Sequence, residues 1–392
     1  MLEKYVVYTA GVRGVTIKRF AEALDMDVVA FFDKNLEIQG KKIDGIEVFS
    51  EEKLEKFIYQ DYQHNKVIVG NSIYYEEIVK YLNSKFNSQV IILKPEIIKK
   101  RYWNQIIYPF REKMTNEYSV IYDTQANEWI QNIMSEVEYW VRMCASLNGI
   151  YHKQYCERIK KKNSNFFCSR IMDKVCQDSV VIDAGCGICS QYGNEIDGNR
   201  IQLIAIDPLA YFYNTINLKS LGVEEKLVKF GMFEFLSLYV GQNVADVILI
   251  DNALDHCIDP FKSILECLAT LKVGGTLSMR HHKCEAVFEG YSGLHKWNVD
   301  VNDNNEFILW NKHNFININE KLGWFAEVCV VYNNLKDDFI DINITKMKNF
   351  NMNLFYDLKG ENSRLAYVIE NIMKIFSTDS INLQFMKLLE EL

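Results

Sequence analysis

The chain has 392 residues, of which 48% are hydrophobic and 13% aromatic, so it can bury large cores and should divide into two or three globular domains. Its formal net charge of -8 argues against nucleic acid as a substrate, because neutralising phosphates requires a basic surface. No run approaches the roughly eighteen apolar residues that span a bilayer, so no membrane span is expected.

The N-terminus, Met-Leu-Glu-Lys, lacks the pattern of a cleavable signal, and the ten cysteines show no disulfide framework; together these predict a cytoplasmic protein. Cys186 and Cys189 form a C-x-x-C, but no second cysteine or histidine pair stands at zinc-ligand spacing. Packing inside a buried turn is therefore preferred over metal or redox chemistry for this pair, and no metal site is predicted.

Residues 1–95 are expected to form a first α/β domain, because strand-like apolar runs alternate with a helical spacing of apolar residues. The expected elements are strands over 5–8, 27–32, 66–69 and 90–93, with helices over 15–24 and 73–86.

The first strand of this domain leads into a turn that contains Gly11 and Gly14, and the second strand ends at Asp33, about twenty residues later, where dinucleotide folds hold a ribose. Thr9 replaces the first glycine of the fingerprint. The turn, the strand end and the 40–49 hairpin resemble the N-terminal Rossmann-like domain of bacterial polysaccharide-biosynthesis and nucleotide-sugar enzymes. The resemblance implies a nucleotide site near Asp33, and a domain that only packs or dimerises is an equal alternative.

Residues 96–178 are expected to form a helical connector and lid. Ser135 and Glu138 match a capping box, and four apolar residues then recur at helical spacing, which predicts an amphipathic helix. These apolar residues are Trp140, Met143, Cys144 and Leu147. We interpret the stripe as core, while the helices just before residue 179 could cover a ligand.

Residues 179–334 restart the α/β alternation. The β-branched run that begins at Val180 stops at Asp183 and gives way to Gly185 and Gly187, which predicts a buried strand that feeds a tight turn. The other expected elements are strands over 201–207, 227–230, 245–250 and 276–280, and a helix over 261–271.

Polar side chains fall at or just beyond the expected ends of these strands. Ligands of open parallel sheets bind outside the carboxyl ends of the strands, so we expect these side chains to surround one site. They are Asp183, Asp207, Asn252, His256, His281 and His282.

With these motifs assembled, residues from about 135 to 330 resemble the class I S-adenosylmethionine-dependent methyltransferases. The resemblance rests on the Asp183–Gly187 turn, on the segment Asn252–Pro260 and on the Gly274–Gly275 turn before the fifth strand. It implies S-adenosylmethionine as the cofactor and Asp207 as the acceptor of its ribose hydroxyls. The implied cofactor-binding residues are Asp183, Ala184, Gly185, Cys186, Gly187, Asp207, Pro208, Met232, Phe233, Asp251 and Asn252.

Two positions depart from the family pattern. Cys189 stands where many members have a third glycine, and Met232 stands where an aspartate often meets the adenine. Met232 and Phe233 could instead sandwich the ring by apolar packing. An NAD-dependent dehydrogenase, the competing identity, fits less well, because the turn begins with an acid and lacks the full G-x-G-x-x-G.

Methyl transfer to a hydroxyl requires alignment and the removal of a proton, a task that suits a histidine. His282 or His281 is preferred over His256 as the general base, with a structural role as the alternative for each. The aromatic and polar segment that follows predicts substrate contacts through Glu285, Tyr291, His295 and Trp297, unless it forms a surface hairpin with the strand expected over 307–310.

Residues 335–392 are expected to form a mainly helical C-terminal extension. Its last part, with Ile372, Phe376, Ile381, Phe385 and Leu388, could pack on the N-terminal domain or on a second subunit of a homodimer.

The expected fold class is α/β, with two Rossmann-like doubly wound sheets, the second a class I methyltransferase fold, a helical connector and a helical tail. The leading hypothesis is O-methylation of a small-molecule acceptor, namely a sugar or nucleotide-linked intermediate of surface-polysaccharide biosynthesis. Methylation of another metabolite and a cofactor-binding scaffold without turnover are the alternatives.

Overall fold

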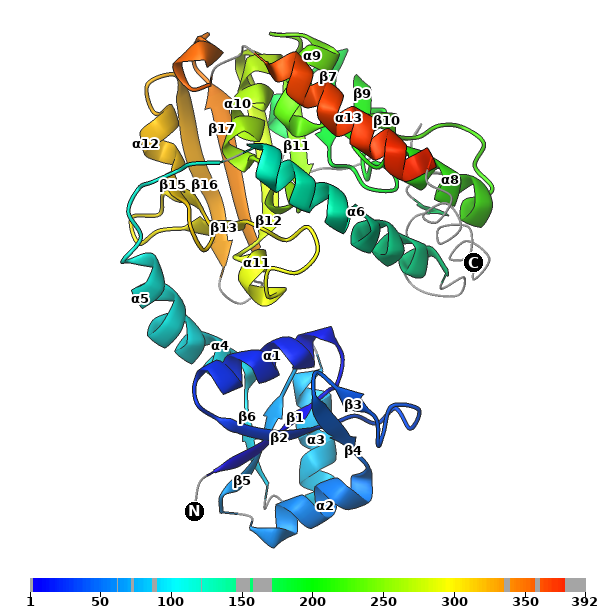
Figure 1. The fold of residues 1–392 in the computed structure, drawn as a ribbon, viewed down its shortest axis with the longest axis vertical. Coiled ribbons are helices and arrows are strands. Elements are labelled where there is room, and N and C mark those ends of the chain that lie inside the picture. The colour runs from blue at the N-terminus through cyan, green and yellow to red at the C-terminus, as the bar shows by residue number, and fades with distance from the viewer. Residues whose placement is uncertain are drawn as a thin grey trace. The chain divides into compact units, whose positions relative to one another are not determined.

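The computed structural model describes residues 3–61, 63–71, 74–86, 90–120, 122–145, 156–157, 171–334, 339–356 and 360–377. The chain divides into two compact units, Met1–Thr115 and Asn116–Leu392 (Figure 1). Each unit has its own sheet and its own hydrophobic core.

The first unit is built on a six-stranded sheet with the order β3-β4-β2-β1-β5-β6. All neighbouring strands are parallel except β3, which forms an antiparallel hairpin with β4. The strands are β1 (Lys4–Tyr8), β2 (Asp27–Phe32), β3 (Lys42–Ile43), β4 (Ile46–Phe49), β5 (Asn65–Val69) and β6 (Ile91–Leu93).

Helices cover both faces of this sheet (Figure 1). Helices α2 (Glu51–Gln60) and α3 (Tyr75–Phe86) bury their apolar stripes against one face, while α1 (Val12–Ala23) lies on the other. Helix α4 (Pro95–Tyr102) packs on α1, where the rings of Phe20 and Tyr102 stack at 4.1 Å. It continues into a π-helical turn (Trp103–Ile107) and α5 (Tyr108–Arg111), so the segment after residue 96, expected as a connector, begins inside the first unit.

The second unit is built on a sheet with the order β10-β9-β7-β11-β12-β17-β16, and the short β8 (Glu195–Ile196) pairs with β9. The strands from β10 to β12 run parallel, whereas β17 is antiparallel to both of its neighbours. Their bounds are β7 (Ser179–Ala184), β9 (Asn199–Asp207), β10 (Lys229–Phe230), β11 (Ala245–Asp251), β12 (Leu271–His282), β16 (Ala326–Asn334) and β17 (Phe339–Lys346).

Both faces of this sheet are buried, which explains why its central strands are apolar along their whole length. Ile182 and Ile248 point into one core cluster, while the adjacent Val181 and Val247 point into another. The predicted class, two Rossmann-like doubly wound α/β sheets, is therefore confirmed for the described residues.

Strand β17 lies where a mainly helical extension was expected. Ile340, Ile342 and Ile344 alternate with polar residues and are fully buried, a period of two that favours a strand over a helix. Helix α13 (Glu361–Ser377) follows, and its Ile372 packs in a cluster with α6 of the same unit rather than on the first unit. The predicted contacts of Ile381, Phe385 and Leu388 lie outside the described residues.

Helix α6 (Tyr122–Ala145) runs without a break through the capping box expected at Ser135. The Ser135 hydroxyl donates to the Asn132 carbonyl inside the helix, so it caps no helix start. Helix α6 shares an apolar cluster with α8 (Ala210–Leu221) and α13. Among the described residues we find no helix that combines the length and the apolar character needed to span a bilayer.

The remaining elements of the second unit include a three-stranded antiparallel sheet, β13-β14-β15. Its strands are β13 (Asn298–Val301), β14 (Phe307–Trp310) and β15 (Phe315–Asn317). The partner strand expected over 307–310 is therefore present, but it pairs with residues 298–301. The other helices are α9 (Leu236–Val240), α10 (Pro260–Thr270), α11 (Glu285–Phe288) and α12 (Ile318–Leu322).

Candidate active site

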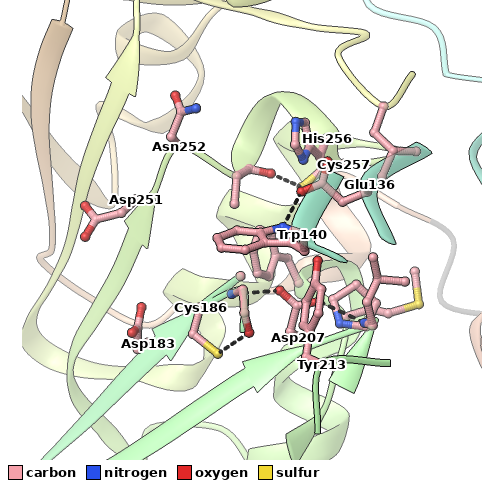
Figure 2. A pocket seen from close by; sticks show the side chains of 18 of the residues that line it. Glu136, Trp140, Asp183, Cys186, Asp207, Tyr213, Asp251, Asn252, His256 and Cys257 are labelled. Carbon is pink, nitrogen blue, oxygen red and sulfur yellow. Dashed lines mark hydrogen bonds between the residues drawn. The ribbon is translucent and has the colours of Figure 1, made fainter. Parts of the chain in front are cut away.

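A cleft that encloses about 1010 Å³, counted to its open mouth, lies at the carboxyl ends of β7, β9 and β11 (Figure 2). All predicted cofactor-binding residues except the fully buried Ala184 line it. The lining also includes Trp129, Glu136, Trp140, Gln191, Leu209, Tyr213, Glu234, Ala253, His256, Cys257 and Leu294.

The turn after β7 brings its backbone to the cleft because two positions exclude a side chain. Gly185 and Gly187 have φ angles of 68° and 63°, in the left-handed region that favours glycine. A Cβ on Gly185 would lie 2.5 Å from Phe233 Cζ, and one on Gly187 would lie 2.9 Å from Trp140 Cζ2. The two glycines therefore let the Phe233 and Trp140 rings pack directly against the backbone of this turn.

Asp207, at the end of β9, ties this turn to the neighbouring strand. Its Oδ2 accepts from the Gly187 N–H at 3.1 Å and its Oδ1 from the Leu209 N–H at 2.8 Å. Burial raises the pKa of Asp207 to about 7, although the two N–H donors act in the opposite direction. Each carboxylate oxygen retains a lone pair for a further donor.

Two more strand-end carboxylates are held by hydroxyl donors. The Ser190 hydroxyl donates to Asp183 Oδ2 at 2.5 Å, and the Tyr192 hydroxyl donates to Asp251 Oδ2 at 2.7 Å. The cleft lining holds five carboxylates, Glu136, Asp183, Asp207, Glu234 and Asp251, and no lysine or arginine. The site is thus acidic and suits a ligand that carries positive charge.

The opposite wall of the cleft is apolar. Met232 and Phe233 follow β10 and are nearly fully buried. The next residue, Glu234, was not predicted, and its Oε1 accepts from the Ile258 N–H at 2.8 Å. Burial raises the pKa of Glu234, so this carboxyl contributes less negative charge than an exposed one.

Helix α6 covers the cleft with two tryptophans that lie about three helical turns apart on one face. The Trp140 N–H donates to Glu136 Oε1 at 2.8 Å, and the Trp129 N–H donates to the His256 carbonyl at 2.9 Å. Figure 2 shows Trp140 between Asp207 and His256. The helix therefore supplies one wall of the cleft.

The three predicted histidines lie in different surroundings. His281 and His282 end β12 outside the cleft lining: His281 is buried opposite Ile340 of β17, and the His282 ring lies 3.9 Å from the Phe339 ring. The backbone N–H of His282 donates to Asn252 Oδ1 at 2.9 Å. Of the three, His256 lines the cleft.

His256 belongs to a polar cluster with Asp255 and His295. The atoms His295 Nδ1 and Asp255 Oδ2 are 2.7 Å apart, and His295 Nδ1 and His256 Nε2 are 3.0 Å apart. Burial alone would raise the pKa of Asp255, but the two histidines lower it to about 2. Burial alone would lower the pKa of His295, whereas the hydrogen bond with Asp255 raises it.

The other residues predicted to contact substrate lie apart from the cleft lining. Glu285 begins α11, where burial, and next the charge of Asp255, raise its pKa to about 8. Tyr291 and Trp297 line a second cavity of about 810 Å³. Trp297 is almost fully buried and stacks on Tyr118 at 5.5 Å.

The lining of the second cavity, unlike that of the cleft, includes lysines beside one acidic residue, Glu128. Lys296, Lys312 and His313 line this cavity. Lys296 pairs with Glu128 at 2.9 Å, and Lys312 lies 4.5 Å from the centre of the Tyr291 ring. The cavity shares Trp129 and Cys257 with the cleft, so the two spaces adjoin.

The first unit repeats the link between a turn and a strand-end acid. Asp33 Oδ2, after β2, accepts from the Ala10 N–H at 3.0 Å. A Cβ on Gly14 would lie 1.9 Å from the Thr9 carbonyl oxygen, so this glycine permits close packing of helix and strand.

No protein-family model and no curated protein matches the sequence. Among solved structures, the chain is similar to the CurJ carbon methyltransferase, with 13% identity, a TM-score of 0.33 and coverage of 45% of this chain and 51% of that one. It is similar to an rRNA methylase from Streptococcus thermophilus (18% identity, TM-score 0.25, 45% of this chain and 92% of that one). It is also similar to UDP-D-quinovosamine 4-dehydrogenase from Vibrio fischeri (20% identity, TM-score 0.20, 24% and 78%).

The matched part of this chain thus spans about half the length of the carbon methyltransferase. At such low identity and TM-score, none of these similarities assigns an activity to the chain.

Half of the cleft residues that were not predicted come from α6 and from the turn after β11. Trp129 and Trp140 share a helix face, and this spacing was a usable signal. Asp255 stands inside the Asn252–Pro260 segment that carried the resemblance, directly before a predicted histidine. Its meeting with His295, forty residues later, depends on the tertiary fold.

Proposed function

We propose that the chain is an S-adenosylmethionine-dependent methyltransferase whose cofactor binds in the cleft of the second unit. The acidic lining carries this proposal. S-adenosylmethionine bears a sulfonium and an ammonium group, whereas NAD bears a pyrophosphate that would need backbone or cationic partners. Five carboxylates without a lysine or arginine in the lining favour the cation.

The residues present fit this cofactor at both of its ends. Gly185 and Gly187 line the cleft with backbone and no side chain, which suits the methionine moiety. Asp207 would accept from two adjacent ribose hydroxyls with its remaining lone pairs. Met232 and Phe233 offer an apolar wall for the adenine in place of an aspartate.

When bound, S-adenosylmethionine supplies a methyl group on a positively charged sulfur. The protein has to orient an acceptor, exclude water and receive the acceptor's proton. Trp129 and Trp140 exclude water from the covered side. The cluster around His256, at the end of the cleft away from Asp207, is the candidate for the proton step (Figure 2).

We infer that the acceptor is a small molecule methylated on oxygen, with a nucleotide-linked sugar of surface-polysaccharide biosynthesis as the candidate. The adjoining cavity with Lys296, Lys312 and His313 supports an acceptor with an anionic group. The resemblance of the first unit to nucleotide-sugar enzymes supports the same class. A different metabolite would use the same cleft without engaging these lysines.

Isothermal titration calorimetry tests the cofactor. We expect S-adenosylmethionine to bind the wild type and Asp207→Ala to weaken binding at least about tenfold, or 1.4 kcal/mol. Asp33→Ala is the matched control, because Asp33 makes the corresponding turn contact in the first unit. NAD is titrated in parallel, and tighter binding of NAD than of S-adenosylmethionine would contradict the proposal.

Transfer of a radiolabelled methyl group tests the acceptor. We expect label on one member of a panel of nucleotide sugars and less transfer when Lys296→Ala and Lys312→Ala are combined. Label on an uncharged metabolite from cell extract would favour the alternative acceptor. Cofactor binding without transfer to the panel or to cell extract would favour the scaffold hypothesis.

A further inference from the structure

Three side chains that lie away from the glycine turn meet at the wall of the cleft. Asp255 and His256 belong to the 3-10 turn Leu254–His256 after β11, and His295 lies in the loop between α11 and β13. His295 Nδ1 is 2.7 Å from Asp255 Oδ2 and 3.0 Å from His256 Nε2, and the last two atoms are 3.5 Å apart. Three atoms of metal-ligating type therefore form one compact triangle.

Hydrogen bonds among the described residues do not use every acceptor of this cluster. A neutral imidazole carries one hydrogen on one of its two nitrogens. If the hydrogen on His295 Nδ1 points at Asp255, His256 Nε2 does not receive that hydrogen. If His256 Nε2 also donates to Asp255, two N–H groups face each other at 3.0 Å. Asp255 is 1% exposed, and its Oδ1 accepts no hydrogen bond from the residues the structure describes.

The dimensions of the triangle match a single metal ion. Its circumradius is about 1.8 Å, shorter than the roughly 2.0–2.2 Å bonds that Zn²⁺ makes to imidazole nitrogen and carboxylate oxygen. One ion about 1 Å off the plane of the three atoms would thus reach all of them. We propose that Asp255, His256 and His295 bind one divalent transition-metal ion.

The ligand types indicate which metals the site would take. Imidazole suits Zn²⁺, Mn²⁺, Fe²⁺ and Co²⁺, whereas Ca²⁺ and Mg²⁺ prefer ligand sets made of oxygen. The site departs from the expectation that the chain has no metal ligands, because that expectation considered spacing along the sequence. His256 and His295 are 39 residues apart, and the fold alone brings them together.

A second buried acidic side chain lies near this cluster. Glu285 interacts electrostatically with Asp255 and is hydrogen-bonded to the Asn252 side chain. Its Oε2 is buried and has no hydrogen-bond partner among the described residues. Charging both acidic side chains in one buried place is costly, and a divalent ion would compensate that charge.

The site is closed on the protein side and open toward the cleft. The side chains of His256 and His295 are 19% and 22% exposed, and His256 lines the cleft. Three protein ligands leave coordination positions for a small molecule. If the proposed function holds, these positions would receive the acceptor's hydroxyl, the ion would lower the pKa of that hydroxyl in place of a histidine base, and the proton would pass to water in the open cleft. This role rests on the proposed function, whereas binding of the ion does not.

Metal binding is tested on the full chain without an affinity tag and without S-adenosylmethionine. The protein is stripped with a chelator and titrated by calorimetry with Zn²⁺ or Mn²⁺ alone. We expect one ion per chain, bound at least tenfold more weakly by Asp255→Asn and by His295→Ala. His64→Ala is the matched control, because His64 pairs with Asp61 at 2.9 Å in the first unit without a second histidine, and it should bind as the wild type does.

Thermal melts of the metal-free variants separate loss of the site from loss of the fold. A spectrum of Co²⁺-loaded wild type provides a readout that needs no variant: nitrogen and oxygen ligands are expected, without a thiolate charge-transfer band. A thiolate band would place the ion on a cysteine, outside the proposed set of ligands, and overturn the proposal. Absence of binding to the wild type, or unchanged binding by both variants, would also overturn it. Calorimetry of S-adenosylmethionine in chelator reports separately on the proposed function.

Discussion

At the scale of the residue, Asp207 holds the glycine turn in place, and the burial of its carboxyl group costs free energy. The carboxyl holds the Gly187 turn through its backbone, yet burial raises its pKa to about 7. The folded chain therefore keeps this proton over a range in which the unfolded chain, with an ordinary aspartate pKa, has lost it.

The raised pKa predicts how stability depends on pH. Between about pH 4 and pH 7 the folded state binds more protons at Asp207, so its contribution to the free energy of unfolding falls as pH rises, by at most about 4 kcal/mol. Urea unfolding of the wild type and of Asp207→Asn at several pH values measures this contribution. The difference between the two should shrink or reverse in favour of Asp207→Asn as pH rises, and a constant difference would contradict the assignment.

Glu285 and Glu234 have raised pKa values for the same reason, since both carboxyls are buried. Asp207→Asn isolates one of these contributions, because the substitution keeps the shape of the side chain and removes only its titration. Asp33→Asn serves as the control, because Asp33 makes the corresponding turn contact in the first unit, and the variant should follow the pH dependence of the wild type.

At the scale of the element, helix α6 is the wall that closes the cleft. Its Trp140 lies against Gly187, and its Trp129 is hydrogen-bonded to the backbone of His256. The helix therefore contacts both the turn and the polar cluster, which lie at different ends of the cleft (Figure 2).

Removing the Trp140 ring should open this wall. We expect Trp140→Ala to raise the dissociation rate of S-adenosylmethionine at least about tenfold, because the ring covers the turn where the methionine moiety would lie. Stopped-flow fluorescence measures the rate. Trp324→Ala is the control, since Trp324 is 47% exposed and does not line the cleft. An unchanged rate in Trp140→Ala would remove α6 from the list of functional elements.

Elements with local signals could be predicted from the sequence. The β-branched run before Asp183 and the two glycines after it identify both the strand and its turn, because strand propensity and left-handed backbone are local properties. Strand β17 carried an equally local signal in its alternating isoleucines, yet this segment was expected to be mainly helical. Periodicity was the better guide there.

Positions that depend on the neighbouring strand could not be predicted. His281 and His282 stand at the end of β12, where ligands of parallel sheets bind, but β17 runs alongside and packs against them. The sequence indicates that this strand ends in two histidines, but it does not indicate which strand packs against them. The meeting of Asp255, His256 and His295 depends in the same way on the path of the chain between α11 and β13.

At the scale of the whole molecule, two units with separate cores share one chain. Each sheet is complete within its own unit, and each unit buries its own cluster of apolar residues. Independent cores of this size are typical of domains that fold alone.

We therefore expect residues 116–392, expressed alone, to unfold cooperatively and to bind S-adenosylmethionine within about twofold of the full chain. Circular dichroism melts and calorimetry on the fragment measure both. Residues 1–115 provide the counterpart and should fold without binding this cofactor. Loss of binding in the larger fragment would show that the first unit contributes to the site, and would then direct attention to the turn around Asp33.

The position of β17 also orders events during synthesis. The ribosome makes β16 before β17, yet among the described strands the partner of β16 is β17, which itself pairs with β12. An emerging chain can thus assemble the strands of the cleft while one edge of β12 stays unpaired and β16 has no sheet to join. The free edge of β12 and the unpaired β16 both gain a partner in a single step. This step takes place when the segment through Lys346 leaves the ribosome and β17 inserts between these two strands.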